Sequence, residues 1–174
     1  MRNWILALAI AAASASLAVS QSRGDTTLQA QLKRVFPGAM AFSSKQAGPP
    51  PHFVAYADSG SKTVAGYVFW TTEVEPLERG YDGPIKMLVG VDTRGLLTGV
   101  LVVEHHEPYG NFSVEPPQFA RQFVGKDIRD PFKVGSDVDA VSRASITINS
   151  ATRAIRNGAR RIARALITPP GAGK

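Results

Sequence analysis

A chain of 174 residues with 44% hydrophobic content is long enough to bury the core of one globular domain, and no second domain is expected. Cysteine is absent, which excludes disulfide bonds, thiolate metal sites and cysteine nucleophiles. The formal net charge of +6 does not indicate nucleic-acid binding, because no basic patch is interleaved with aromatic residues.

Residues 1–20 have the pattern of a secretory signal peptide. A short positive start precedes an apolar run over residues 4–17, and the small residues Ala18-Val19-Ser20 form a cleavage pattern before Gln21. This pattern predicts export to the periplasm or another extracytoplasmic compartment. An uncleaved N-terminal anchor is the alternative, because the apolar run is close to the shortest length that spans a bilayer.

Residues 21–65 are predicted to hold a helix, a linker and a first strand. Leu28, Leu32 and Val35 have helical spacing, and Pro37-Gly38 is expected to end this helix. The proline-rich residues 47–51 predict a stiff loop, because too little chain precedes them to fold as a domain of its own.

Segments rich in aromatic and β-branched residues follow, each with the length of a strand. Residues 58–61 separate the first two strands and residues 93–95 the last two, which predicts two hairpins. The expected fold class is α+β, with an antiparallel sheet of two hairpins packed in two layers with a C-terminal amphipathic helix, in a single domain. The predicted strands are residues 52–57, 63–72, 85–92 and 96–105.

The stretch from Asp137 to Leu166 predicts a long amphipathic helix with hydroxyl residues at its start. One hydroxyl is expected to cap the helix, and the others are available at a terminus whose free N–H groups favour a phosphate. The arginines are expected to form a solvated face. The apolar stripe is Ile148, Ala151, Ile155, Ala159, Ile162 and Leu166; the hydroxyls are Ser142, Ser145, Thr147 and Ser150; the arginines are Arg153, Arg156, Arg160, Arg161 and Arg164.

The segment from Asp139 to Thr147, DAVSRASIT, resembles the D-x-x-S/T-G-A-T-x-T motif of the FMN-binding domain. That domain occurs in the sodium-translocating NADH:quinone reductase, in the Rnf complex and in NosR-type proteins. The resemblance implies that FMN is esterified through its phosphate to Ser145, which replaces the motif threonine, with Thr147 as the second candidate acceptor. Arg143 replaces the motif glycine, while Ser142 and Ala144 match the motif.

Two further segments resemble the same family. Residues 80–85, GYDGPI, match a G-Y-x-G-P-I segment that includes Tyr81 and Gly83, and residues 104–110, EHHEPYG, partly match an H-x-E-T-P-G-L-G loop that includes His106 and Glu107. The resemblance implies a flavin ring near Tyr81 and His106. It predicts an FMN-binding domain over residues 66–166 and a flexible tail over 167–174.

The resemblance implies an FMN flavoprotein that carries electrons, rather than an enzyme with its own substrate. Its expected partners are a flavin transferase for maturation and redox proteins that are membrane-bound or extracytoplasmic. Arg143 is a candidate for stabilising the reduced ring near its N1 and C2 carbonyl edge.

Other interpretations fit these residues less well. His105 and His106 with neighbouring glutamates suggest a metal, but adjacent residues on a strand point to opposite faces, and no metal site is predicted. A serine hydrolase is disfavoured because no G-x-S-x-G elbow is present. Two alternatives stay open: a flavin-free exported binding or scaffold module that uses the arginine face, and a protein that binds FMN reversibly without a covalent bond.

Overall fold

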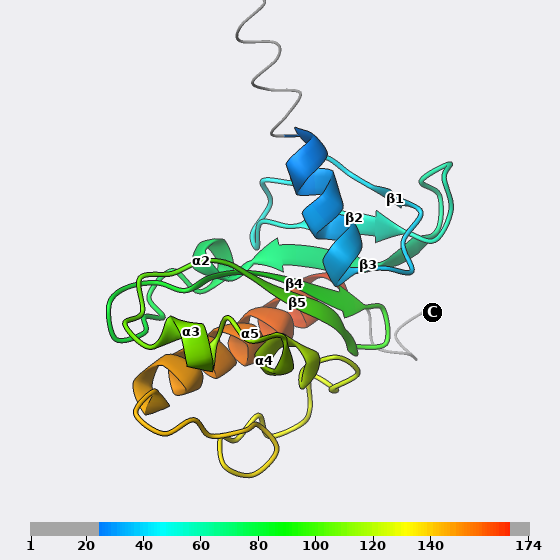
Figure 1. The fold of residues 1–174 in the computed structure, drawn as a ribbon. Helices are drawn as coiled ribbons and strands as arrows, with labels where there is room; N and C mark the ends of the chain where they lie inside the picture. Colours follow the sequence, from blue (N-terminus) through cyan, green and yellow to red (C-terminus); the bar gives the residue numbers. More distant parts are fainter. Residues whose placement is uncertain (1–24, 168–174) are drawn as a thin grey trace, which may run out of the picture. The chain divides into compact units, whose positions relative to one another are not determined.

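The structure is a computed structural model that describes residues 25–167. Contacts divide the chain into two units, residues 1–31 and 32–174. The described residues of the first unit, 25–31, are helical, and the second unit begins with helical residues 32–35 (Figure 1). The predicted helix that ends before Pro37-Gly38 is thereby confirmed. The predicted signal peptide and the tail from residue 168 lie outside the described residues.

One five-stranded antiparallel sheet organises the second unit, with its strands in sequence order. The expected antiparallel strands are confirmed. The two predicted hairpins belong to one continuous sheet, because β3 also pairs with β4. The short first strand was not predicted. The strands are β1 (Ala41–Phe42), β2 (Phe53–Tyr56), β3 (Val64–Trp70), β4 (Lys86–Asp92) and β5 (Leu97–Glu104).

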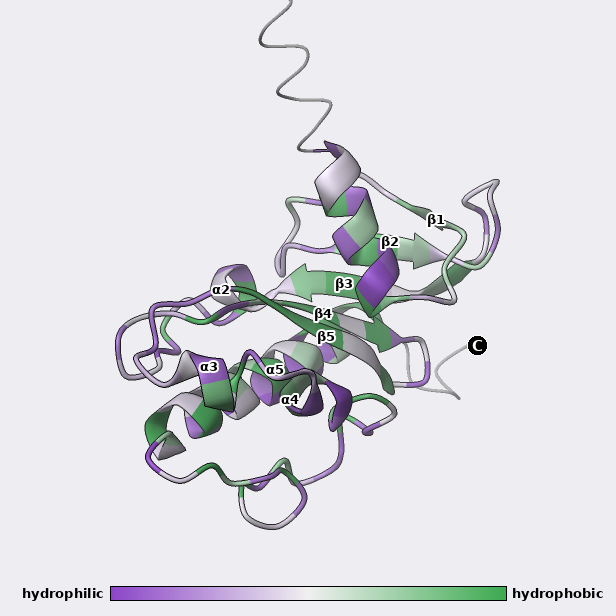
Figure 2. Cartoon of the chain, viewed as in Figure 1, coloured by the Kyte–Doolittle hydropathy of each residue, from purple (hydrophilic) through white to green (hydrophobic). Residues whose placement is uncertain are grey.

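Both faces of this sheet are covered. Strand β4 is apolar throughout its middle, as expected of a strand buried on both sides, and Figure 2 shows this hydrophobic character along the central strands. Met87, Val89 and Val91 belong to the main core with the C-terminal helix. On the other face Val35 packs so closely that a Cβ on Gly99 would lie 2.6 Å from the Val35 carbonyl oxygen. The expectation of two layers was therefore incomplete.

Helix α5 (Ser145–Leu166) covers the main-core face, and the short helices α3 (Gly110–Ser113) and α4 (Pro117–Arg121) lie on the same side of the sheet (Figure 1). The predicted apolar stripe of α5 packs in this core. Gly158 lets the helix approach β3, since a Cβ there would lie 2.5 Å from the Phe69 ring. Arg160 donates to the carbonyl oxygen of Ile128 at 2.7 Å. Within residues 25–167, no helix has the length and apolar character required to cross a bilayer.

Candidate functional site

The carboxylate of Glu107 joins the segments that carry the sequence motifs. It accepts hydrogen bonds from the backbone N–H of Tyr81 at 2.9 Å and of Asp82 at 3.0 Å, and the Thr147 hydroxyl donates to it as well. Glu107 follows β5, the two N–H groups lie before β4, and Thr147 lies in the first turn of α5. One side chain, only 6% exposed, therefore holds two loops and a helix together.

Gly80 makes this arrangement possible. A Cβ at position 80 would lie 2.3 Å from Glu107 Oε1 and 2.6 Å from its Cδ, well inside van der Waals contact. Only glycine therefore lets the carboxylate reach the neighbouring N–H groups.

The hydrogen bonds also decide the charge state of Glu107. Burial raises the pKa of its carboxyl group, but the bonds from Thr147 and from the two backbone N–H groups lower it, and the nearby His105 lowers it further. The net result is a pKa below the ordinary value of 4.5. Glu107 is accordingly ionised at neutral pH and acts as an acceptor only.

His105 supports the Glu107 loop. In the neutral ring, Nδ1 accepts the backbone N–H of Glu107 at 3.1 Å and Nε2 carries the proton; Nε2 lies 3.1 Å from the carboxylate of Glu115. A Cβ on Gly110 would overlap this ring at 2.0 Å. Strand β5 ends at Glu104, so His105 and His106 lie beyond it. The described residues contain no group of three potential ligands that could hold a metal ion.

Residues 75–84, here called the site loop, are tied to α5 by arginines. Arg153 donates to Glu78 from Nη2 at 2.6 Å and from Nε at 3.1 Å, and Arg161 Nε lies 3.1 Å from Glu75. Both arginines are exposed, as expected of a solvated face, but they also form ion pairs that the sequence did not predict. Their acidic partners are distant in sequence, which is why helical periodicity alone did not reveal them.

The start of α5 differs from the prediction. The N-cap is Ala144, and no side chain caps the helix. Ser145 is already the first helical residue, so Ser145, Thr147 and Ser150 lie inside the first turns, whereas Ser142 lies before the helix. Thr147 is 3% exposed and bonded to Glu107, whereas Ser145 is exposed and its hydroxyl has no hydrogen-bond partner among residues 25–167.

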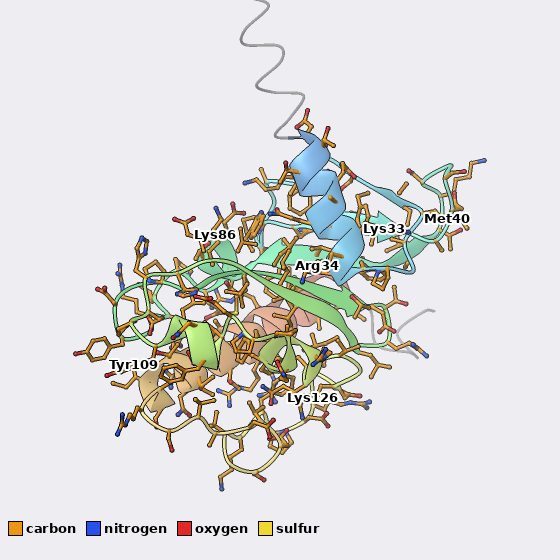
Figure 3. All side chains as sticks on the ribbon, viewed as in Figure 1. Lys33, Arg34, Met40, Lys86, Tyr109 and Lys126 are labelled. Atoms are coloured by element: carbon orange, nitrogen blue, oxygen red, sulfur yellow. The ribbon has the colours of Figure 1, made fainter. Side chains whose placement is uncertain are left out.

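A cavity of about 310 Å³ opens beside Ser145. Its exposed rim is aromatic, with Tyr81 69% and Tyr109 43% exposed, and Tyr109 lies near the start of α3 (Figure 3). Tyr109 also packs against Phe112, with ring centroids 5.3 Å apart. The complete lining is Tyr81, Pro108, Tyr109, Arg143, Ala144, Ser145, Ile146 and Thr147.

The predicted site residues divide into those that reach this cavity and those that do not. The sequence did not predict Pro108, Tyr109 and Ile146 as lining residues. For Ile146 a signal was available, because it is an apolar residue between the hydroxyl residues Ser145 and Thr147. Tyr81, Arg143, Ala144, Ser145 and Thr147 line the cavity, and Glu107 supports it. Gly83, His106, Asp139 and Ser142 do not line it.

Comparison with known proteins supports the resemblance. Residues 80–160 match the FMN-binding domain family. The matched range contains the site loop from Gly80 onward, the loop after β5 that includes Glu107, and the start of α5. The resemblance predicted from the motifs is confirmed, and FMN is the cofactor of this domain.

The chain is also similar to proteins named as the G component of an ion-translocating oxidoreductase complex. The relative from Erwinia tasmaniensis is 32% identical over 131 residues, which are 70% of this chain and 58% of that protein. The relative from Yersinia pestis is 29% identical over 119 residues, which are 63% of this chain and 54% of that protein. The chain thus spans little more than half the length of these relatives.

The residues of the cavity suit FMN. Aromatic and aliphatic side chains offer surface for a flavin ring, and Ser145 and Arg143 offer a hydroxyl and a cation for a phosphate at the N-terminal end of a 22-residue helix.

Proposed function

We propose that this protein is an exported electron carrier whose FMN is attached through a phosphoester to Ser145. The proposal rests on the Ser145 hydroxyl, which is exposed at the cavity of the FMN-binding domain. This hydroxyl has no hydrogen-bond partner among residues 25–167. In the attachment step, Ser145 Oγ forms a bond to the flavin phosphorus and loses its proton. When the donor is a flavin dinucleotide, the pyrophosphate bond breaks and a nucleoside monophosphate leaves.

Ser145 is favoured over Thr147 as the acceptor because the two hydroxyls have different surroundings. The Thr147 hydroxyl is buried and donates its proton to the Glu107 carboxylate. An attack by this oxygen would require the Glu107 bond to break and the helix start to open. The Ser145 hydroxyl needs neither change.

FMN, when bound, supplies reversible electron transfer that no side chain of this chain can perform. The chain would hold the flavin at an open cavity whose rim is formed by Tyr81 and Tyr109, so that a partner protein can approach. The names of the relatives support a membrane-bound redox complex as the partner. Export through the predicted signal peptide would place the relay outside the cytoplasm, where a covalent bond prevents loss of the cofactor.

The test is co-expression with a flavin transferase, followed by intact-mass measurement of the denatured protein. We expect a mass gain equal to FMN less water in the parent protein, retention of the gain in Thr147→Ser and loss of the gain in Ser145→Ala. Ser142→Ala is the matched control, because Ser142 is an exposed hydroxyl of the same motif that does not line the cavity. A gain that survives Ser145→Ala, or no gain in the parent protein, contradicts covalent attachment at Ser145.

The same preparation distinguishes the two alternatives. Reversible FMN binding predicts yellow protein that loses its colour on denaturation and filtration. The flavin-free module predicts colourless protein. The structure disfavours the module, because Arg153, Arg160 and Arg161 of its proposed binding face already have partners within the chain.

A further inference from the structure

Arg143 has a backbone conformation that is unusual for its residue type. Its φ is +65°, in the left-handed region that glycine adopts readily and other residues rarely do. The motif of the FMN-binding domain has glycine at this position. The chain therefore keeps the backbone shape of the motif but places a long cationic side chain on it, at a conformational cost that glycine would avoid.

The side chain of Arg143 forms no hydrogen bond or ion pair with any residue from 25 to 167. Among residues 25–167, its guanidinium group has neither a carboxylate partner nor a hydrogen-bond acceptor, unlike Arg153, which pairs with Glu78. It lines the cavity together with Ser145, two residues further along the chain. A strained backbone and an unpaired cation at the mouth of the cavity indicate a role that depends on a bound anion.

We propose that Arg143 is a positioning and specificity residue that pairs with the phosphate of the flavin, so that the site selects phosphorylated flavins. This inference rests on the proposed function. A guanidinium group binds phosphate oxygens in a bidentate manner, and the N-terminus of α5 favours the same charge. The phosphate retains one negative charge after esterification, so the same pairing persists in the attached state.

The phosphate is a better partner for Arg143 than the ring edge suggested by the sequence. A phosphate on Ser145 Oγ would lie within reach of residue 143, whereas the N1 and C2 carbonyl edge is separated from the phosphate by the whole ribityl chain. The residue next to the attachment point therefore meets the phosphate first. During attachment, the same pairing would hold the flavin-side phosphate of the dinucleotide donor close to the Ser145 oxygen.

The experiment compares FMN with riboflavin, which has the same ring but lacks the phosphate. Full-length protein free of flavin is purified from cells without a flavin transferase, and affinities for both flavins are measured by fluorescence titration. The variants are Arg143→Gln, Arg143→Lys and Arg143→Gly. Ser61→Gly is the matched control, because Ser61 is another non-glycine residue with a left-handed φ, +54°, and lies outside the cavity.

We expect the parent protein to bind FMN more tightly than riboflavin. Arg143→Gln should weaken FMN binding by about 10- to 100-fold, the loss expected for one charged hydrogen-bonding partner, and leave riboflavin binding unchanged. Arg143→Lys should retain part of the preference. Arg143→Gly and Ser61→Gly should both raise the Tm of the flavin-free protein by about 1–3 °C, but only Arg143→Gly should lose the preference for FMN.

Several results would overturn the inference: equal affinity of the parent protein for both flavins, no detectable binding of either, an unchanged preference in Arg143→Gln, or a lower Tm in Arg143→Gly. Each is distinguishable from failure of the proposed function. If the parent protein still gains the mass of FMN less water beside a flavin transferase, only the role of Arg143 is lost. If the parent protein takes up flavin by neither route, the proposed function itself is lost.

Discussion

The carboxylate of Glu107 is predicted to stabilise both the fold and the site, and Glu107→Gln is the sharpest test. An amide keeps the size of the side chain but only one acceptor oxygen. Glu107 Oε2 accepts from Tyr81 N and Oε1 from Asp82 N, so in either orientation the amide NH₂ faces a backbone N–H. At least one buried donor loses its acceptor. A bond to a charged group contributes about 1.5–3 kcal/mol, and we therefore expect a loss of about 2–3 kcal/mol of unfolding free energy.

Gly80→Ala should disrupt the same hydrogen bonds of Glu107 by adding a side chain at position 80. The added Cβ would lie 2.3 Å from Glu107 Oε1, so the carboxylate must retreat from the N–H groups. We expect a loss at least as large as that of Glu107→Gln. The double variant should lose less than the sum of the two, because both changes break the same bonds. Gly38→Ala is the control: nothing lies within 4 Å of a Cβ there, and its effect should stay within about 0.5 kcal/mol.

The assay is equilibrium urea unfolding of flavin-free protein, followed by circular dichroism. The extent of FMN attachment beside a flavin transferase is measured on the same variants, and it should fall for Glu107→Gln and Gly80→Ala but not for Gly38→Ala. Two results would refute the reasoning: a Glu107→Gln protein as stable as the parent, or strictly additive losses in the double variant.

Three further predictions concern pH, packing and the site loop. Because folding lowers the pKa of Glu107, the contribution of its carboxylate to stability is fully present above pH 4.5 and is lost as the pH falls through the lower pKa of the folded protein. In urea unfolding at several pH values, the unfolding free energies of the parent protein and of Glu107→Gln should therefore become equal only under acid conditions. Gly158→Ala should destabilise the protein by about 1–3 kcal/mol, because the added Cβ would overlap the Phe69 ring. Helix propensity alone predicts the opposite, a gain of about 1 kcal/mol. A more stable variant would show that α5 does not pack this closely against β3. Glu78→Ala, which removes the carboxylate that accepts both hydrogen bonds from Arg153, should change stability by less than about 1 kcal/mol but speed tryptic cleavage of the site loop, as followed by mass spectrometry; unchanged cleavage would mean that this pair does not hold the loop.

Local patterns were sufficient for most of the secondary structure. The strands from β2 to β5 follow β-branched and aromatic runs separated by turn residues, and their observed ends lie close to the predicted ones. Strand β1 was missed because two residues carry no periodicity; Ala41 and Phe42 become a strand only through pairing with Tyr56 and Ala55. The covering of the second sheet face was missed for a similar reason, since it depends on Val35 meeting glycines of β4 and β5.

The start of α5 shows where local rules fail. Hydroxyl residues at the beginning of a helical pattern normally indicate an N-cap, but here Ala144 takes that position. The Thr147 hydroxyl instead donates to Glu107, which lies 40 residues earlier in the chain. The ion pairs of the exposed arginine face were missed for the same reason, because the acids that pair with Arg153 and Arg161 belong to the distant site loop.

The sequence by itself therefore determined the elements, the order of the motifs and the resemblance to the FMN-binding domain, because periodicity, turn chemistry and motif residues are properties of neighbouring positions. Only the tertiary structure decided which hydroxyl is accessible, which carboxylate joins the loops and that the arginine of the motif stays unpaired within residues 25–167. Accessibility and hydrogen bonding at Ser145, Glu107 and Arg143 depend on segments that are far apart in the chain and meet only after folding.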